Sequence, residues 1–219
     1  MWKEEENNGS NSITCADVEG SHIYVGLSSG YIVGYLVDEM VQAASVGDAF
    51  PKPNGKFKAH DAGVTALSCA GEGSLRISRP DTKSSILLTG GTDGIVKQWE
   101  MISDDSSPTS TKLQHWPRIS SQRMKRRAHL FEGHSPGPIT SLACADPSKI
   151  LSAGADGTVR AWSPSKGTEM FRMDGFTDSL TSLCLVEDLL ITDGMEQFVC
   201  VHDFDVNDSE FESGYELEW

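Results

Sequence analysis

The strongest hydrophobic pattern in the chain is a group of short runs in its second half, in which apolar and polar residues alternate. Two such runs, Ile139 to Ala143 and Ile150 to Ala153, are separated by a turn that contains a proline. Asp156-Gly157 then suits the positive φ angles of a tight hairpin turn, and a third run, Thr158 to Trp162, follows it. The pattern predicts three antiparallel strands and a candidate fourth strand from Met170 to Met173.

An earlier stretch of the chain repeats this pattern closely. Ala59-His60 precedes a first run, Val64 to Cys69, and the segment from Leu88 to Trp99 contains two further runs around Asp93-Gly94. The polar and aromatic residues that match between the two copies are His60 and His134, Thr89 and Ser152, Asp93 and Asp156, and Trp99 and Trp162.

A weaker copy lies on the C-terminal side of these two. Leu180 to Cys184 fits the first strand, and Leu190 to His202 fits the next two. Phe176, Glu196 and His202 stand where the better copies have His, Asp and Trp. This copy therefore keeps the strand pattern and loses the polar residues.

A fourth copy lies on the N-terminal side, with runs at Ile13 to Ala16, His22 to Leu27 and Tyr31 to Leu36. Ser29 occupies its Asp position and Tyr35 its Trp position. Repeats of this kind bury their apolar faces only against neighbouring repeats, so atypical residues are expected in the terminal copies.

The Gly-His pair, the strand Ser or Thr, the turn Asp and the closing Trp make the chain similar to the WD-repeat (WD40) family. The Trp-Asp dipeptide that names the family is not kept, because Glu100 follows Trp99 and Ser163 follows Trp162. The resemblance implies an all-β fold in which each repeat is a β-propeller blade, a four-stranded antiparallel sheet. About four WD-type repeats are expected.

The expected domain organisation follows from these repeats. Residues 1–10 are acidic and polar, and we expect a disordered N-terminus there. The WD-repeat propeller domain is expected to span residues 11–205. Its repeats lie at about residues 11–47, 55–101, 128–165 and 169–205, with an insertion loop at 102–127 and an acidic tail or outer strand at 206–219.

Four repeats are fewer than the seven or eight blades that are usual in this family, so the resemblance implies a partial or open propeller with apolar end faces. Three explanations are open: the chain is a piece of a larger propeller with missing blades, two chains pair into one ring, or a rare four-bladed ring forms. Exposed end faces would favour assembly or aggregation.

The repeated His, Ser or Thr and Asp contain the residue types of a hydrolase triad. A catalytic triad occurs once in a protein, whereas this set recurs at matching positions and ends on a Trp in both copies. By resemblance to WD-repeat proteins, the two sets are expected to be structural tetrads in which His bridges the turn Asp and the strand hydroxyl, and the hydroxyl meets the indole N–H. The tetrads comprise His60, Thr89, Asp93 and Trp99, and His134, Ser152, Asp156 and Trp162.

The same resemblance predicts two different rims. The Gly-His and Asp-Gly turns are short and emerge on one rim, which we call the trim rim. The three irregular stretches, Asp38 to Lys56, Gly71 to Ser85 and Met101 to about His129, emerge on the other, and the first of them is expected to be a loop. Candidate partner-binding residues beside the trim-rim turns are Asp61, Thr92, Ser135, Ala155, Asp178 and Glu196.

The net charge of −14 argues against a general nucleic-acid surface. The longest insertion contains the one basic cluster of this acidic chain. The cluster is either part of a solvated loop or a patch for nuclear import or for binding an acidic partner. This basic insertion contains Arg118, Arg123, Lys125, Arg126 and Arg127.

The five cysteines have no CxxC spacing, so we expect buried free thiols and a reducing compartment. The chain starts without an apolar signal region and has no run long enough for a membrane span. A cytoplasmic or nuclear location and no membrane association are therefore expected. No metal or cofactor is expected either, because the remaining histidines are isolated from any cluster with ligand spacing and the sequence has no phosphate-binding loop.

The expected function is a non-enzymatic scaffold that mediates protein–protein interactions in a multi-protein complex and binds protein or peptide partners. One alternative is a substrate receptor of a ubiquitin ligase, although both closing tryptophans lack the Asp and Arg of the Trp-Asp-x-Arg motif that such receptors use. Another alternative is an RNA-associated protein that uses the basic insertion, and an enzyme has no supporting constellation.

Overall fold

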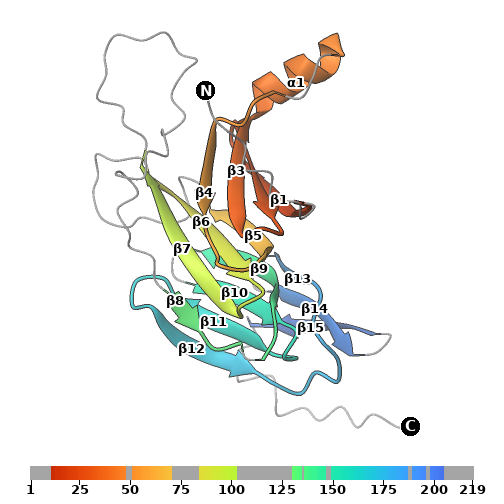
Figure 1. Ribbon diagram of the computed structural model, residues 1–219. Coiled ribbons are helices and arrows are strands. Elements are labelled where there is room, and N and C mark those ends of the chain that lie inside the picture. Colours follow the sequence, from red (N-terminus) through yellow and green to blue (C-terminus); the bar gives the residue numbers. More distant parts are fainter. Residues whose placement is uncertain are drawn as a thin grey trace.

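The computed structural model describes residues 11–47, 51–70, 84–102, 130–134, 136–146, 149–186, 189–195 and 198–204 (Figure 1). These residues form four antiparallel sheets, one for each repeat, and we number them blades 1 to 4 along the chain. Blade 1 contains β1 (Ile13–Glu19), β2 (His22–Leu27), β3 (Tyr31–Leu36) and β4 (Gly55–Lys58). Blade 2 contains β5 (Val64–Ala70), β6 (Ser84–Gly91), β7 (Ile95–Ile102) and β8 (Leu130–Glu132).

The later blades repeat this order. Blade 3 contains β9 (Ile139–Asp146), β10 (Lys149–Gly154), β11 (Val159–Ser163) and β12 (Thr168–Met173). Blade 4 contains β13 (Leu183–Val186), β14 (Leu189–Met195) and β15 (Phe198–Asp203). Within each blade, consecutive strands pair antiparallel, so the strands of each sheet lie in their sequence order. The expected all-β architecture of propeller blades is confirmed.

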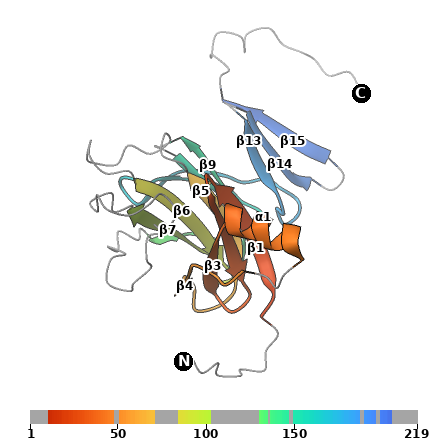
Figure 2. The ribbon, with the colours of Figure 1, turned by 90° about the horizontal axis from the view of Figure 1, so that it is seen from above.

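The first strand of each blade lies on the inside of the arc. β1 packs beside β5, β5 beside β9, and β9 beside β13. Figure 2 shows that blade 4 lies away from blade 1, so the four described sheets form an open arc. The expected partial or open propeller is confirmed for this part of the chain.

Each pair of neighbouring blades shares a hydrophobic cluster. Blades 1 and 2 meet through Tyr24, Ile32, Val64 and Leu87. Blades 2 and 3 meet through Leu88, Val96, Phe131, Ile139, Ile150 and Trp162. Blades 3 and 4 meet through Leu151, Val159, Leu180 and Leu190. The middle strands of blade 3, β10 and β11, therefore bury both faces, and β11 is buried along its whole length.

The sequence predicts a loop from Asp38 to Lys56, but the structure shows regular elements there. This stretch contains most of α1 (Val37–Val46) and the start of β4. Glu, Met, Gln and Ala favour helix here, and Asp38 and Glu39 lie in the first turn, where negative charge is favourable. Gly47, at φ 69°, ends the helix with an N–H bond to the carbonyl of Ala43.

The expectation of buried cysteines is only partly correct. All five carry thiols rather than disulfides, but Cys184 is exposed and the other four are half-buried. Burial raises the pKa of Cys15 and Cys69, so these two thiols stay protonated near neutral pH. Cys184 is exposed because its face of blade 4 has no neighbouring sheet among the described residues.

Two glycines with similar backbone angles distinguish backbone strain from contact between blades. Gly94, at φ 72°, turns between β6 and β7, and an added Cβ would lie 1.9 Å from the carbonyl oxygen of His134. Gly47, at φ 69°, has open space at the same position. The turn of blade 2 therefore packs directly on the loop that enters blade 3.

We predict that Gly94→Ala destabilises the protein by roughly 2 kcal/mol or more beyond Gly47→Ala, since both lose about 1 kcal/mol to strain but only the first creates a clash. Urea unfolding followed by tryptophan fluorescence measures the difference. Equal losses for the two variants would show that the turn does not hold the blades together.

Candidate protein-binding rim

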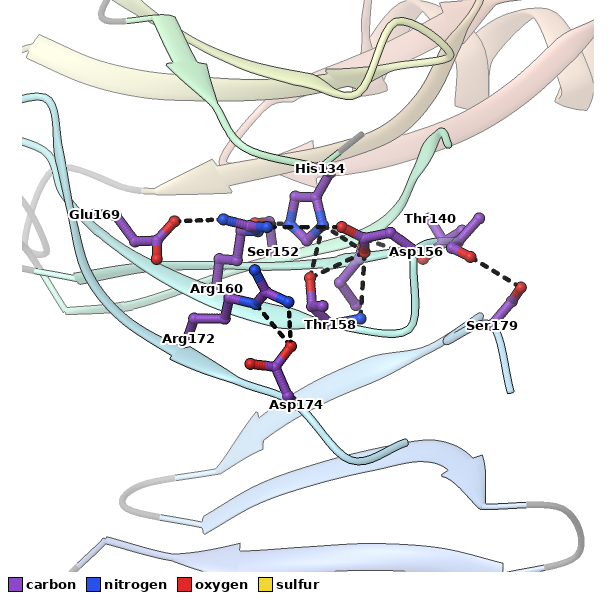
Figure 3. Close-up of polar contacts among 12 residues, drawn as sticks. His134, Thr140, Ser152, Asp156, Thr158, Arg160, Glu169, Arg172, Asp174 and Ser179 are labelled. Atoms are coloured by element: carbon purple, nitrogen blue, oxygen red, sulfur yellow. Dashed lines mark hydrogen bonds and ion pairs between the residues drawn. The ribbon is translucent and has the colours of Figure 1, made fainter. Parts of the chain in front are cut away.

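The best-formed polar site lies on the trim rim of blade 3, where a buried histidine joins β10 to the turn that follows it (Figure 3). His134 precedes β9 and is 1% exposed. Its Nδ1 lies 2.9 Å from Asp156 Oδ1, and its Nε2 lies 2.8 Å from Ser152 Oγ. Trp162 Nε1 donates to the same Ser152 oxygen at 2.8 Å. Four side chains from three segments thus form one continuous hydrogen-bonded chain.

One arrangement of protons satisfies every donor in this chain. The Trp162 indole donates to Ser152 Oγ, the Ser152 hydroxyl donates to His134 Nε2, and His134 Nδ1–H donates to the Asp156 carboxylate. Histidine is neutral in this arrangement. Each buried polar group then has a partner, which avoids the loss of about 1–3 kcal/mol that each unpaired group causes.

Blade 2 contains the matching arrangement. His60 Nδ1 lies 3.1 Å from Asp93 Oδ2, and His60 Nε2 lies 2.9 Å from Thr89 Oγ1. Trp99 Nε1 donates to Thr89 Oγ1 at 3.0 Å. The structure therefore brings together both groups of four residues that the sequence spacing associates.

Burial lowers the pKa of both His60 and His134, although the neighbouring Asp opposes this effect. At Asp156, burial acts to raise the pKa, but hydrogen bonds from His134 and Thr158 outweigh it and lower the pKa overall. The combination is a neutral imidazole that donates to an ionised carboxylate.

A buried arginine adds to the blade 3 site. Arg160 is 8% exposed, and its guanidinium contacts Glu169 at 2.6 Å and Asp156 at 3.8 Å. The Thr158 hydroxyl also donates to Asp156 at 2.9 Å. Sequence reasoning missed these residues, because blade 2 has Lys97 at the position of Arg160 and the repeat comparison selected only shared residues.

The geometry of these sites does not match that of a hydrolase triad. Ser152 and Thr89 are completely buried, and each already accepts a hydrogen bond from a tryptophan. A substrate carbonyl cannot approach such an oxygen, whereas a catalytic nucleophile must be exposed to its substrate. The arrangement instead fixes the loops that precede β5 and β9.

Blades 1 and 4 lack the full chain of hydrogen bonds. Blade 1 has Val25 at the Ser or Thr position. In blade 4, Thr192 is 2% exposed, and its Oγ1 has no partner among the described residues. Phe176 and His202, which replace His and Trp, contact each other edge to face, with ring centroids 6.0 Å apart. Aromatic packing thus replaces the polar chain.

Asp193 connects the loop and strand of blade 4 in a different way. Its carboxylate accepts the N–H groups of Thr181 and Ser182 at 2.9 and 3.1 Å, together with the Thr181 hydroxyl. These bonds hold residues 181 and 182 outside the sheet, so β13 begins at Leu183 and not at the expected Leu180. The sequence signal was an Asp beside the strand Thr, which the repeat template did not contain.

Each loop that enters a new blade also packs on the turn of the blade before it. An added Cβ at Gly30 would lie 2.1 Å from the carbonyl oxygen of His60, and one at Gly157 would lie 3.4 Å from that of Asp178. The loops after β4, β8 and β12 are therefore held by two blades at once, and they make the trim rim a closely connected surface.

The predicted partner-binding residues fall into three groups. Asp61, Thr92 and Asp178 are exposed on the trim rim, and Ala155 is half-buried there. Thr92 donates its N–H to the carbonyl of Gly63 at 3.0 Å, which connects the turn of blade 2 to the neighbouring loop. Ser135 and Glu196 lie outside the described residues.

The opposite rim carries α1, which leaves blade 1 at the end of β3 remote from the Ser28–Gly30 turn (Figure 1). None of the residues of α1 is buried. The basic insertion, with Arg118, Arg123, Lys125, Arg126 and Arg127, lies outside the described residues, as do the proposed N-terminal segment 1–10 and the tail 206–219.

Neither a metal site nor a membrane-spanning helix is found in the part of the chain that the structure describes. In that part, no three His, Cys, Asp or Glu side chains are placed to hold a metal ion. The same residues include no helix with the length and apolar character that crossing a membrane requires.

Comparison with known proteins gives one family model, described as "WD domain, G-beta repeat", which matches residues 51–100 and 125–163. A curated protein from Vanderwaltozyma polyspora, "CCR4-associated factor 4 homolog", is 33% identical over 101 residues. That match covers 44% of this chain and spans only 15% of the length of the relative.

Solved structures show the same fold at lower identity. The WD40 beta propeller domain of Doa1 is 17% identical with a TM-score of 0.58, and the match covers 87% of this chain and 50% of that chain. The computationally designed Ika4 protein is 19% identical with a TM-score of 0.57, and the match covers 93% of this chain and 99% of that chain. A chain in the Mitotic Checkpoint Complex is 19% identical with a TM-score of 0.54, and the match covers 85% of this chain and 47% of that chain.

The lowered histidine pKa values predict a pH-dependent stability. The unfolded chain protonates its histidines near their ordinary pKa of about 6.5, whereas folded His60 and His134 resist protonation because they are buried. Their contribution to stability is therefore complete above about pH 6.5 and decreases as the pH falls below that value.

We predict a lower free energy of unfolding at about pH 5.5 than at about pH 7.5, measured by urea titration. The double variant His60→Asn with His134→Asn should show a smaller pH dependence, because the two shifted groups are gone. Other titrating groups, including half-buried His22, are common to both proteins. An unchanged pH dependence in the variant would contradict this assignment.

Two buried threonines at matching positions allow a direct test of the hydrogen-bonded chain. Thr89 bonds to His60 and Trp99, whereas the Thr192 hydroxyl has no partner among the described residues. We predict that Thr89→Val lowers the free energy of unfolding by about 1–3 kcal/mol, because it leaves two groups unpaired. Thr192→Val, which has the same shape change, should be neutral or stabilising. Equal losses in denaturant unfolding would contradict the prediction.

Proposed function

Because this chain is a WD-repeat protein, we propose that it is a non-enzymatic scaffold whose trim rim binds protein or peptide partners within a multi-protein complex. The proposal rests on one observation: buried hydrogen bonds fix the loops of the trim rim in position. Buried His60 and His134 fix the loops that enter blades 2 and 3, while Asp61, next to His60, and Pro136, in the loop of His134, are exposed. A surface of fixed loops loses little conformational entropy on binding.

The charge of the trim rim suggests the chemistry of the partner. Asp61 and Asp178 are exposed there, and Asp93 is partly exposed at the turn of blade 2. Two lysines lie near these residues: the ammonium group of Lys58 is on the carbonyl oxygens of Ser29 and Asp61, at 2.7 and 3.4 Å, and that of Lys97 is on the carbonyl oxygen of Ala59, at 2.9 Å. The exposed carboxylates therefore favour a partner segment that carries Lys, Arg or hydrogen-bond donors.

The buried hydroxyls support the non-enzymatic part of the proposal. The hydroxyls that contact a His–Asp pair belong to Thr89, Ser152 and Thr158, and all three are buried and hydrogen-bonded within their own blades. The names of similar proteins, a CCR4-associated factor and a chain of a checkpoint complex, support membership of a multi-protein complex. Location in the cytoplasm or the nucleus remains part of the proposal.

The proposal is tested by charge reversal on each rim. Tagged wild-type chain, a trim-rim variant (Asp61→Arg with Asp178→Arg) and a control variant on α1 (Asp38→Arg with Glu39→Arg) carry two reversed carboxylates each, all exposed. Proteins crosslinked to each in cells are then quantified by mass spectrometry. We expect the trim-rim variant to lose its specific partners by roughly tenfold or more and the α1 variant to retain them.

The opposite result would contradict the proposal. If the α1 variant loses the partners and the trim-rim variant keeps them, the binding surface is the rim of the insertions. Circular dichroism and unfolding curves for both variants establish that neither change acts by unfolding the blades.

A further inference from the structure

The two ends of the arc carry the two halves of a blade-to-blade interface. We call the face of a blade that points toward the preceding blade its rear face, and the other its forward face. In blades 2 and 3 the rear face is built on a cross-strand pair, Leu87 with Trp99 and Ile150 with Trp162. Leu87 and Ile150 are completely buried against the blade before them.

Blade 1 has the same pair on its rear face, where no described blade precedes it. Ile23 pairs with Tyr35 in the same register, and both pack in a cluster made only of blade 1 residues. Around this cluster, Ile13 is 70% exposed and Val18 is 57% exposed. A sheet with two apolar faces is typical of one covered on both sides.

Blade 4 presents the complementary face. In blade 3, Leu151 pairs with Ala143 and Ala161, and this group is buried against blade 4. The matching group in blade 4 is Ile191 with Cys184 and Val201.

In blade 4 this group is open, because Val201 is 59% exposed and Cys184 is also exposed. Neighbouring apolar residues on the same face are exposed too: Val186 by 51%, Leu189 by 37% and Val199 by 69%. Exposed Asp203, which pairs with Leu189, borders this group of apolar residues at its outer edge. A contiguous group of exposed apolar residues marks an interaction surface.

We propose that the forward face of blade 4 binds the rear face of blade 1 in a second copy of this chain. Within the chain, every contact between neighbouring blades joins a forward face to a rear face, and the two open faces are one of each kind. Pairing them continues an interface that the molecule already makes three times. Lys56 and Lys58 lie at the outer edge, over the ring of Tyr31, where charge is compatible with an interface.

Two such contacts close a ring. A head-to-tail contact gives a closed assembly when the rotation allows it and an open filament when it does not. The arc overlays on 50% of the WD40 beta propeller domain chain of Doa1, so two copies have the extent of one complete propeller. Both apolar end faces are then covered.

The first measurement is mass in solution. Light scattering on the full chain should give twice the 23.7 kDa of one chain. Val201→Glu blocks the forward face and Val18→Glu blocks the rear face, and each should weaken association by roughly tenfold or more, since each places a charge in both contacts of the ring. Met170→Glu, at a residue 49% exposed on the outer strand of blade 3, is the matched control.

Mixing the two blocked variants distinguishes this arrangement from pairing of like faces. A mixed pair regains one unmodified contact, so the 1:1 mixture should associate more strongly than either variant alone. If blade 4 instead paired with blade 4, Val18→Glu would have no effect, and the proposal would be overturned.

Alkylation of Cys184 gives a second readout. This thiol should react more slowly in the wild-type chain than in Val18→Glu, although the substitution lies on the other blade. Three results overturn the proposal: a monomer at every concentration, a mass above two chains, or equal masses for the blocked and control variants. A monomer with protected Cys184 also overturns it and assigns the face to another segment of the same chain.

Discussion

The arrangement of the two central blades depends on the need to satisfy buried polar groups where a loop enters the sheet. A strand hydroxyl, an imidazole and an indole are enclosed in blades 2 and 3, and each is acceptable there only because the next group completes its hydrogen bonds. The same bonds fix where the entering loop meets the sheet. Hydrophobic contact then holds one blade on the next, and the polar chain anchors each entering loop to its own blade.

Much of the fold could be predicted from the sequence because the repeat states each constraint twice. Asp-Gly at the turn, a hydroxyl four residues before the Asp and a Trp six residues after it occur in both good copies. The recurring spacings selected these residues, and the resemblance to the WD-repeat family predicted that their side chains meet in space. In blades 1 and 4, where the polar residues are lost, the alternation of apolar and polar residues was sufficient to predict the strands.

Other features could not be predicted because they belong to one copy only. Asp193 takes over the loop contact in blade 4, and Arg160 fills the outer part of blade 3 with a charge that two carboxylates neutralise. The sequence predicts a loop in place of α1, because Pro51, Pro53 and Gly55 follow closely and are typical of turns. A repeat template describes what copies share, so it does not reveal how an individual copy compensates for its differences.

The helix α1, in which no residue is buried, affects how the sequence of such a protein can change during evolution. Its residues contribute nothing to the clusters between blades, and its last turn is closed by its own backbone through Gly47. A connection of this kind can lengthen, shorten or be exchanged without repacking any sheet. The rim that carries α1 can therefore accept changes in sequence and length, including inserted segments. The trim rim cannot change as freely, because its loops must keep the hydrogen bonds of the buried histidines.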